Sequence, residues 1–194
     1  MNAVVFASGS GTNFDALVDA QNDGRLNVKI KGVVCDKMAA PVRKKARTYG
    51  IPEKWYDPKF YKNKADYESD ILEWLKELDA DMIILSGYMR IVGKTLLDAY
   101  PKRIVNLHPA LLPNFPGAHA IQDAYEANVD TTGVTVHYID ENVDTGPVII
   151  QESVAIDPAW SLDELERAVH AKEYDLFWRG INQAAKEIEA ADAA

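Results

Sequence analysis

The chain has 194 residues, of which 47% are hydrophobic and 26% charged, and this usage is ordinary for a globular protein. The composition excludes a disordered chain, a collagen-like fibre and a disulfide-rich scaffold, and it predicts one folded domain over residues 1–194. The 30 acidic and 21 basic residues give a net charge of −9, which argues against a nucleic-acid binder because such proteins present a basic surface.

The first half of the chain alternates short apolar runs with segments whose apolar residues recur at helical spacing. The runs predict strands at residues 3–7, 28–34, 53–56, 81–85 and 103–107, and the segments between them predict helices at residues 13–22, 41–49, 65–78 and 94–99. Continuous apolar strands that alternate with helices are typical of a parallel sheet covered on both faces. We therefore expect an α/β fold with a mostly parallel, twisted sheet.

The second half of the chain has a different pattern. Alternating residues at 133–139 and an apolar run at 147–154 predict an added antiparallel strand pair, joined by the polar loop 140–146. A long helix is expected from residue 162 to about 188, because Ser161 and Glu164 have the spacing of a capping box. The Ala-, Glu- and Asp-rich residues after about 186 predict a frayed helix end or a tail.

The cysteine and histidine content limits the chemistry. Cys35 is the only cysteine, so the chain cannot form an internal disulfide or a zinc site of several cysteines. The four histidines have spacings that match no metal-binding pattern, so we expect no metal site. The N-terminus lacks a secretory signal pattern and no apolar run could span a bilayer, so we expect a cytoplasmic protein without a membrane partner.

The glycine loop, residues 7–13, lies between the first predicted strand and the first predicted helix. A helix start offers free N–H groups and the positive end of the dipole, and Thr12 and Asn13 add polar side chains, so a phosphate can bind here. The alternative is an ordinary turn in which Thr12 or Asn13 caps the helix. Phe14 replaces the third glycine of a dinucleotide fingerprint, but Asp36, at the end of the second strand, leaves an NAD-dependent oxidoreductase as a remote alternative.

The fifth predicted strand ends in two polar residues, Asn106 and His108, which are two positions apart and therefore point to one side. Ligands of open parallel sheets bind beyond the carboxyl ends of the strands. A neutral amide and a protonated imidazole are suited to stabilise a developing oxyanion. Asp144, in the polar loop, is our candidate for a carboxylate that would raise the pKa of His108 and orient its ring. The alternative is that the histidine is structural and the aspartate is only a turn residue.

Six motifs together resemble the folate-dependent formyltransferases, and the resemblance covers residue 3 to about residue 177. The motifs are residues 7–13, 87–90, 106–113, 115–117, 132–137 and 143–147. The chain is most similar to the family members that pass the formyl group of 10-formyltetrahydrofolate to the amine of glycinamide ribonucleotide in purine synthesis. The resemblance implies a Rossmann-like fold and small-molecule substrates, and leaves open a monomer or a homodimer.

The resemblance also implies roles for individual residues. The resemblance implies that Asn106, His108 and Asp144 are catalytic residues. It also implies that the amine attacks the formyl group directly, without a covalent intermediate on the enzyme. Its ribonucleotide-binding residues are Gly11, Thr12, Asn13, Lys64 and Glu173. Its folate-binding residues are Met89, Arg90, Ile91, Val92, Asp140, Glu141 and Val143. The chain departs from the family at Ala110, where serine is frequent, and at Lys64, where relatives can have arginine.

Three other functions compete with this interpretation. A formyltetrahydrofolate deformylase, which has the same catalytic residues and uses water in place of the amine, is the nearest alternative, although its relatives usually have an N-terminal domain that we do not expect here. Methionyl-tRNA formyltransferase is disfavoured because it has an additional C-terminal domain. A folate- or nucleotide-binding module without catalysis would need the glycine loop but not the set Asn106, His108 and Asp144.

Overall fold

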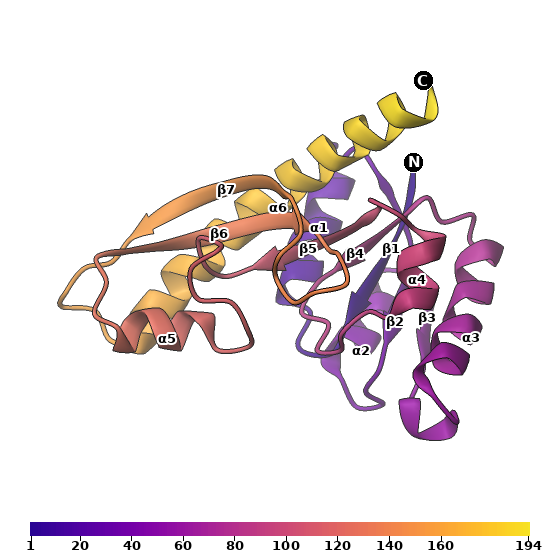
Figure 1. The fold of residues 1–194 in the computed structure, drawn as a ribbon, viewed down its shortest axis with the longest axis horizontal. Helices are drawn as coiled ribbons and strands as arrows, with labels where there is room; N and C mark the ends of the chain where they lie inside the picture. Colours follow the sequence, from indigo (N-terminus) through magenta and orange to yellow (C-terminus); the bar gives the residue numbers. More distant parts are fainter.

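The computed structural model describes all 194 residues, and its seven strands form one mixed sheet (Figure 1). The strand order is β3-β2-β1-β4-β5-β6-β7. The bounds are β1 Asn2–Ala7, β2 Lys29–Cys35, β3 Glu53–Trp55, β4 Met82–Leu85, β5 Ile104–His108, β6 Thr131–Tyr138 and β7 Val148–Ala155. Strands β1 to β5 pair in parallel, whereas β6 and β7 are antiparallel. The predicted α/β fold with an added antiparallel pair is therefore confirmed.

Six α-helices and one 3₁₀ turn connect the strands. They are α1 Thr12–Asn22, α2 Pro41–Thr48, η1 Pro58–Phe60, α3 Lys64–Glu77, α4 Lys94–Ala99, α5 Ala120–Glu126 and α6 Leu162–Asp192. The sequence does not predict α5 or η1. Helix α5 has seven residues and buries only Ala120 and Ala124, so its apolar pattern is too short to recognise. No helix has both the length and the apolar character needed to span a membrane.

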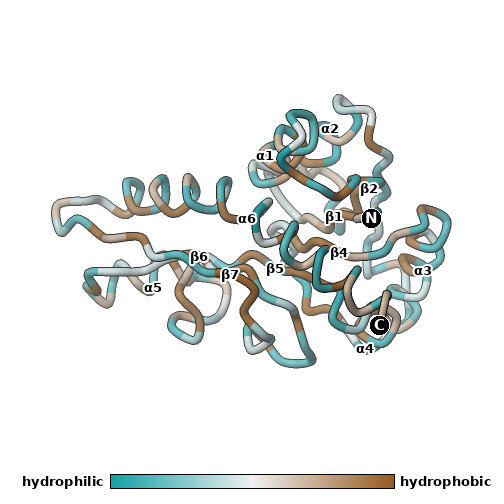
Figure 2. The backbone as a smooth tube through the Cα atoms, turned by 90° about the horizontal axis from the view of Figure 1, so that it is seen from above, coloured by the Kyte–Doolittle hydropathy of each residue, from teal (hydrophilic) through white to brown (hydrophobic).

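The sheet buries side chains on both faces, as the apolar strands predict. Val5 of β1 belongs to the larger core cluster, which also contains residues of α1, α2 and α6. Val4 and Phe6, which point the other way, belong to a second cluster with residues of α3 and α4. Figure 2 shows that the hydrophobic residues concentrate along the central strands of the sheet. Since strands β1 to β5 pair in parallel, the loops that follow them lie at the same end of the sheet.

Helix α6 extends further than the sequence indicates. The capping box of Ser161 and Glu164 is present, which confirms the predicted start. At the other end we expect fraying after about residue 186, but the helix continues to Asp192. Ile188 is buried in the larger cluster, and Asp192 pairs with Arg103, the residue immediately before β5. The burial of Ile188 and the ion pair of Asp192 thus accompany the last turns of α6. Both contacts are made with residues distant in sequence, so a local sequence pattern cannot predict them.

Candidate active site

Two adjoining cavities open where the parallel strands end. The glycine-loop cavity, about 340 Å³, is lined mainly by residues 8–13, and the larger cavity, about 420 Å³, includes Asn106, His108 and Asp144 in its lining. Asn13, Gly87 and Met89 line both cavities, so one elongated ligand or two neighbouring ligands can occupy them together. Ligand sites of open α/β sheets lie at this edge of the sheet.

The backbone of the glycine loop leaves donors free at the start of α1. Gly11 is the N-cap residue, with φ 77°, and no side chain caps the helix. The turn in which Thr12 or Asn13 caps the helix is therefore absent. A Cβ at Gly11 would lie 2.9 Å from Cγ2 of Val42, so both the left-handed conformation and the close approach of α2 require glycine. The first N–H groups of α1 remain available to an anion.

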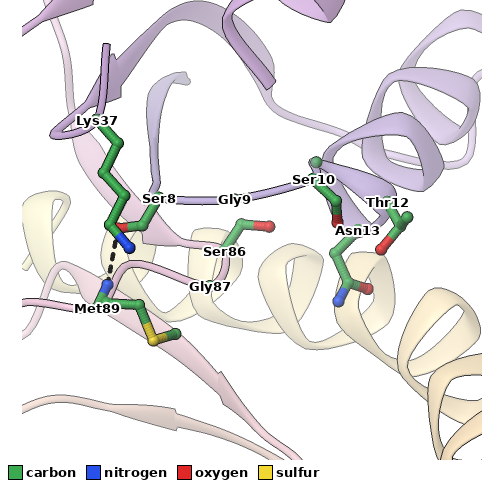
Figure 3. A pocket seen from close by; sticks show the side chains of 10 residues that line it. Ser8, Gly9, Ser10, Thr12, Asn13, Lys37, Ser86, Gly87 and Met89 are labelled. Carbon is green, nitrogen blue, oxygen red and sulfur yellow. Dashed lines mark hydrogen bonds between the residues drawn. The ribbon is translucent and has the colours of Figure 1, made fainter. Parts of the chain in front are cut away.

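The only charged side chain in the lining of the glycine-loop cavity belongs to Lys37, which the sequence analysis does not single out. Figure 3 shows Lys37 on one side of the cavity and Thr12 and Asn13 on the other. The pairing of Ala7 with Cys35 explains this position, because it brings the residues after β1 and β2 side by side. The position of Lys37 beside the glycine loop could be predicted only by someone who already knew the strand order and register.

Lys64, for which the resemblance implies ribonucleotide binding, lies away from the glycine-loop cavity. Its Nζ donates a 2.7 Å hydrogen bond to the carbonyl oxygen of Ile91, and Lys64 lines neither cavity. The reason is the packing of α3, whose first residue is Lys64, beside residues 91–93. Lys64 therefore contacts the segment for which the resemblance implies folate binding.

Glu173 forms a buried polar group with two neighbours at the junction of the cavities. It lies on α6 and is 5% exposed, and its two carboxylate oxygens accept hydrogen bonds from Nδ2 of Asn13 at 2.9 Å and from Nδ1 of His170 at 2.6 Å. The hydrogen bond to Glu173 raises the pKa of His170, while partial burial opposes it. No motif of the sequence assigns a role to His170, although the His-x-x-Glu spacing on one helix is typical of such a pair.

We expect the pair His170–Glu173 to contribute to stability in a pH-dependent way. Because the pKa of His170 is raised in the folded state, its contribution is complete below the unfolded pKa and is lost as the pH rises through the folded value. The Tm advantage of the wild type over His170→Gln should therefore be larger at about pH 6 than at about pH 9. A His119→Gln variant is the control, because His119 is exposed and forms no side-chain hydrogen bond. A Tm difference that stays constant with pH would contradict the expectation.

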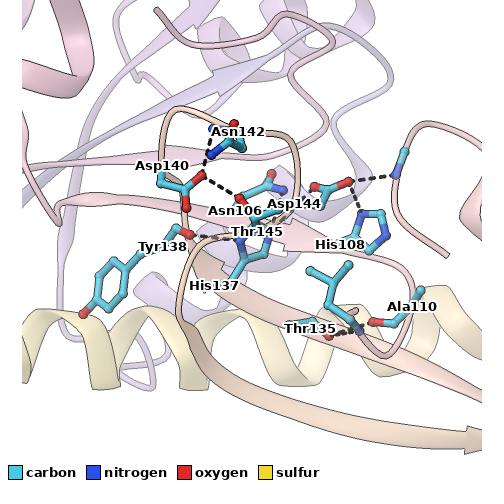
Figure 4. A network of polar contacts seen from close by, with 12 residues as sticks. Asn106, His108, Ala110, Thr135, His137, Tyr138, Asp140, Asn142, Asp144 and Thr145 are labelled. Atoms are coloured by element: carbon cyan, nitrogen blue, oxygen red, sulfur yellow. Dashed lines mark hydrogen bonds and ion pairs between the residues drawn. The ribbon is translucent and has the colours of Figure 1, made fainter. Parts of the chain in front are cut away.

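Asn106 and His108 end strand β5, and the structure brings Asp144 to the same wall of the larger cavity (Figure 4). His108 is 4% exposed, and its Nε2 donates to the carbonyl oxygen of Phe115 at 2.8 Å. Its Nδ1 lies 3.6 Å from Oδ2 of Asp144. The backbone thus engages Nε2, whereas Nδ1 faces the carboxylate of Asp144 beyond hydrogen-bond distance and remains open to a ligand in the cavity.

Backbone strain accompanies both oxygen partners of His108. Phe115 and Asp144 have φ values of 50° and 55°, in the left-handed region that non-glycine residues rarely adopt. Oδ2 of Asp144 also accepts a 2.8 Å hydrogen bond from the N–H of Gly117, which ties the loop of Asp144 to the loop after β5. Strained conformations of this kind persist where the surrounding contacts impose them, and they concentrate at functional sites.

His137 orients the amide of Asn106, a role that the sequence alone does not predict. The two residues are opposite each other on β5 and β6, and Nδ2 of Asn106 lies 3.2 Å from Nε2 of His137. Nδ1 of His137 lies 3.0 Å from the carbonyl oxygen of Tyr138, so Nδ1 carries the proton and Nε2 accepts. Burial lowers the pKa of His137 and favours this neutral form. One N–H of the Asn106 amide is thereby engaged, and the other remains available.

Most residues with an implied folate-binding role line the larger cavity. These are Met89, Arg90, Ile91, Val92, Asp140 and Val143. Glu141 is exposed and lines neither cavity, and its neighbour Asn142 lines the larger one instead. Arg90 donates from Nε to Oδ2 of the buried Asp36 at 2.8 Å. That ion pair occupies the acid that a dinucleotide-binding site would need for a ribose, which weakens the oxidoreductase alternative.

Comparisons with known proteins give a consistent set of relatives. A family model described as formyl transferase matches residues 1–181. The chain is 42% identical over 179 residues to the phosphoribosylglycinamide formyltransferase of Bacillus subtilis, and the match covers 92% of each protein. The crystal structure of phosphoribosylglycinamide formyltransferase from Bacillus halodurans matches with a TM-score of 0.90 and 45% identity, over 93% of each chain. Glycinamide ribonucleotide transformylase 1 from Geobacillus kaustophilus matches with a TM-score of 0.90 and 49% identity, over 93% of this chain and 96% of that one.

Proposed function

The chain belongs to the formyl transferase family, and we propose that it transfers the formyl group of 10-formyltetrahydrofolate to the primary amine of glycinamide ribonucleotide. Its relatives from Bacillus subtilis and Geobacillus kaustophilus have names that describe this activity. The structural observation that carries the proposal is the convergence of Asn106, His108 and Asp144 on one wall of a cavity. That cavity adjoins a glycine loop with free backbone donors.

Each substrate has a region of matching chemistry. The phosphate of the ribonucleotide fits the free N–H groups at Gly11, Thr12 and Asn13, and its glycinamide end would extend past Glu173 into the larger cavity. The flat rings of the folate fit the apolar side chains of Met89, Ile91 and Val143, which are 66%, 62% and 52% exposed.

The reaction needs an oxyanion site and a proton more than it needs a strong base. A primary α-amine has a pKa near about 8, so part of it is neutral at pH 7 and can attack the formyl carbon directly. The new C–N bond forms as a tetrahedral oxyanion develops, and the bond to the folate nitrogen then breaks. The free N–H of Asn106 and the protonated ring of His108 stabilise the oxyanion, and one such donor contributes roughly 3–4 kcal/mol. Nδ1 of His108 supplies the proton that the departing nitrogen requires, and the attacking nitrogen, which becomes cationic as its C–N bond forms, returns a proton to the ring.

The test of this function is turnover with and without the second substrate. The protein is mixed with 10-formyltetrahydrofolate, and loss of the formyl-folate absorbance is followed in the presence and absence of glycinamide ribonucleotide. Turnover that requires the ribonucleotide supports the transferase. Turnover with water alone would identify the deformylase, and a folded protein without turnover in either mixture would contradict both activities.

The Lys64→Ala variant should affect folate more than ribonucleotide. Lys64 donates to the carbonyl oxygen of Ile91, so its loss frees part of the segment that we assign to the folate. We expect the KM for the folate to rise about threefold to tenfold, with the KM for the ribonucleotide nearly unchanged. Lys62→Ala is the matched control, because Lys62 is exposed and forms no side-chain hydrogen bond. A larger rise in the ribonucleotide KM would instead support the ribonucleotide contact that the resemblance implies for Lys64.

A further inference from the structure

Residues 87–93, here called the folate segment, contain no helix or strand, and side chains from other elements hold their backbone. The N–H of Met89 donates to Oγ of Ser8 at 2.9 Å, and the carbonyl oxygen of Ile91 accepts from Lys64. The side chains of Met89 and Ile91 nevertheless remain exposed. Their position relative to the larger cavity therefore depends on contacts made by the backbone.

Glu68 of α3 makes the contact that ends the folate segment. Its Oε2 accepts a 2.8 Å hydrogen bond from the N–H of Gly93, immediately before α4 begins. The side chain is 3% exposed, and Oε1 is buried without a hydrogen-bond partner. A buried carboxylate with one unpaired oxygen is unfavourable for stability, and an apolar side chain of similar size would avoid that penalty. Burial raises the pKa of this carboxyl, while the N–H of Gly93, the ammonium of Lys64 and the N–H of Leu96 oppose the rise, so the glutamate serves the start of α4 as well as the end of the folate segment.

Gly93 permits the close approach of this carboxylate. Its φ and ψ of −96° and −178° are open to any residue, so the turn itself does not require glycine. A Cβ at Gly93 would however lie 2.7 Å from Oε1 of Glu68 and 2.7 Å from Cδ of Lys64. Glu68 and Lys64 can therefore pack against the end of the folate segment only because residue 93 has no side chain.

We propose that Glu68 is a positioning residue for the folate co-substrate, acting through the N–H of Gly93. The hydrogen bond fixes the end of the folate segment against α3, so that Met89 and Ile91 keep their places in the wall of the larger cavity. This inference rests on the proposed function for the identity of the ligand. It assigns to Glu68 no contact with either substrate, since Glu68 lines neither cavity.

The decisive comparison uses two variants of similar size. Glu68→Met removes the acceptor, whereas Glu68→Gln keeps an oxygen that can accept from Gly93. We expect Glu68→Met to raise the KM for 10-formyltetrahydrofolate about tenfold, because it leaves the part-buried N–H of Gly93 without an acceptor, and Glu68→Gln to restore most of the loss. The ribonucleotide KM should change little in both. Glu77→Met is the matched control, because Glu77 is an exposed glutamate of the same helix without a hydrogen-bond partner.

Direct binding separates this inference from the proposed function. The Kd of tetrahydrofolate, measured by calorimetry without the ribonucleotide, should rise about tenfold in Glu68→Met even if turnover proves to be hydrolysis. Wild-type Kd and KM values in a folded Glu68→Met protein, equal changes in both KM values, or no rescue by Glu68→Gln would each overturn the proposal. If Glu68→Met does not fold, Gly93→Ala replaces it. The added methyl group displaces Glu68, and should weaken tetrahydrofolate binding without changing the ribonucleotide KM.

Discussion

Replacing Asp144 with asparagine is expected to lower kcat by roughly 10²- to 10⁴-fold while the KM values for both substrates change little. The substitution keeps the size of the side chain and an oxygen that can accept from the N–H of Gly117. It removes the negative charge 3.6 Å from Nδ1 of His108. An imidazolium loses its stabilising partner as a result, and the uncharged ring is a weaker donor to an oxyanion and cannot supply a proton.

Asp123→Asn is the control for loss of a negative charge. Asp123 is exposed, its side chain forms no hydrogen bond or ion pair, and it lines neither cavity, so its replacement should leave kcat within about twofold of the wild type. Both variants should show the wild-type circular dichroism spectrum and a similar Tm. A folded Asp144→Asn protein with near-normal kcat would remove Asp144 from the mechanism.

The order of strands and helices could be predicted because its cause is local. Continuous apolar runs such as β1 and β4 are buried on both faces, and the helices between them show one apolar side, so periodicity alone distinguishes them. Helix α5 could not be predicted in this way, because seven residues with two buried alanines carry no recognisable period. The last turns of α6 were also hidden, since they depend on contacts such as the pair Arg103–Asp192, 89 residues apart in the sequence.

In the candidate site too, the features with a local cause could be predicted, and those that depend on contacts distant in sequence could not. Asn106 and His108 belong to one strand, so their common direction follows from the alternation of side chains. Asp144 could be named from the resemblance and its polar loop, but its distance from His108 depends on how that loop folds back over the sheet. The roles of His137 and Glu68 could not be predicted, because a cross-strand partner and a contact between a helix and a loop exist only once the elements are packed.

The Asn106→Leu variant is expected to lower kcat by about 10²- to 10³-fold, the loss typical of one oxyanion donor. Leucine has nearly the same shape as asparagine but donates no hydrogen bond. Little change is expected in the ribonucleotide KM, because the assigned phosphate donors lie at the start of α1. Stopped-flow measurement of a single turnover would show whether the chemical step itself is slowed. A higher KM with an unchanged kcat would indicate that Asn106 binds the ground state and does not act on the oxyanion.

The partner of Asn106 gives this prediction a second test. A neutral His137 accepts one N–H of the Asn106 amide, so the His137→Phe variant removes the acceptor and lets the amide rotate. Its kcat should fall by about tenfold, less than that of Asn106→Leu, because the donor remains but is no longer oriented. In the double variant there is no amide left to orient, and the loss should match that of Asn106→Leu alone. Additive losses would show that His137 acts on the reaction by a route that does not include Asn106.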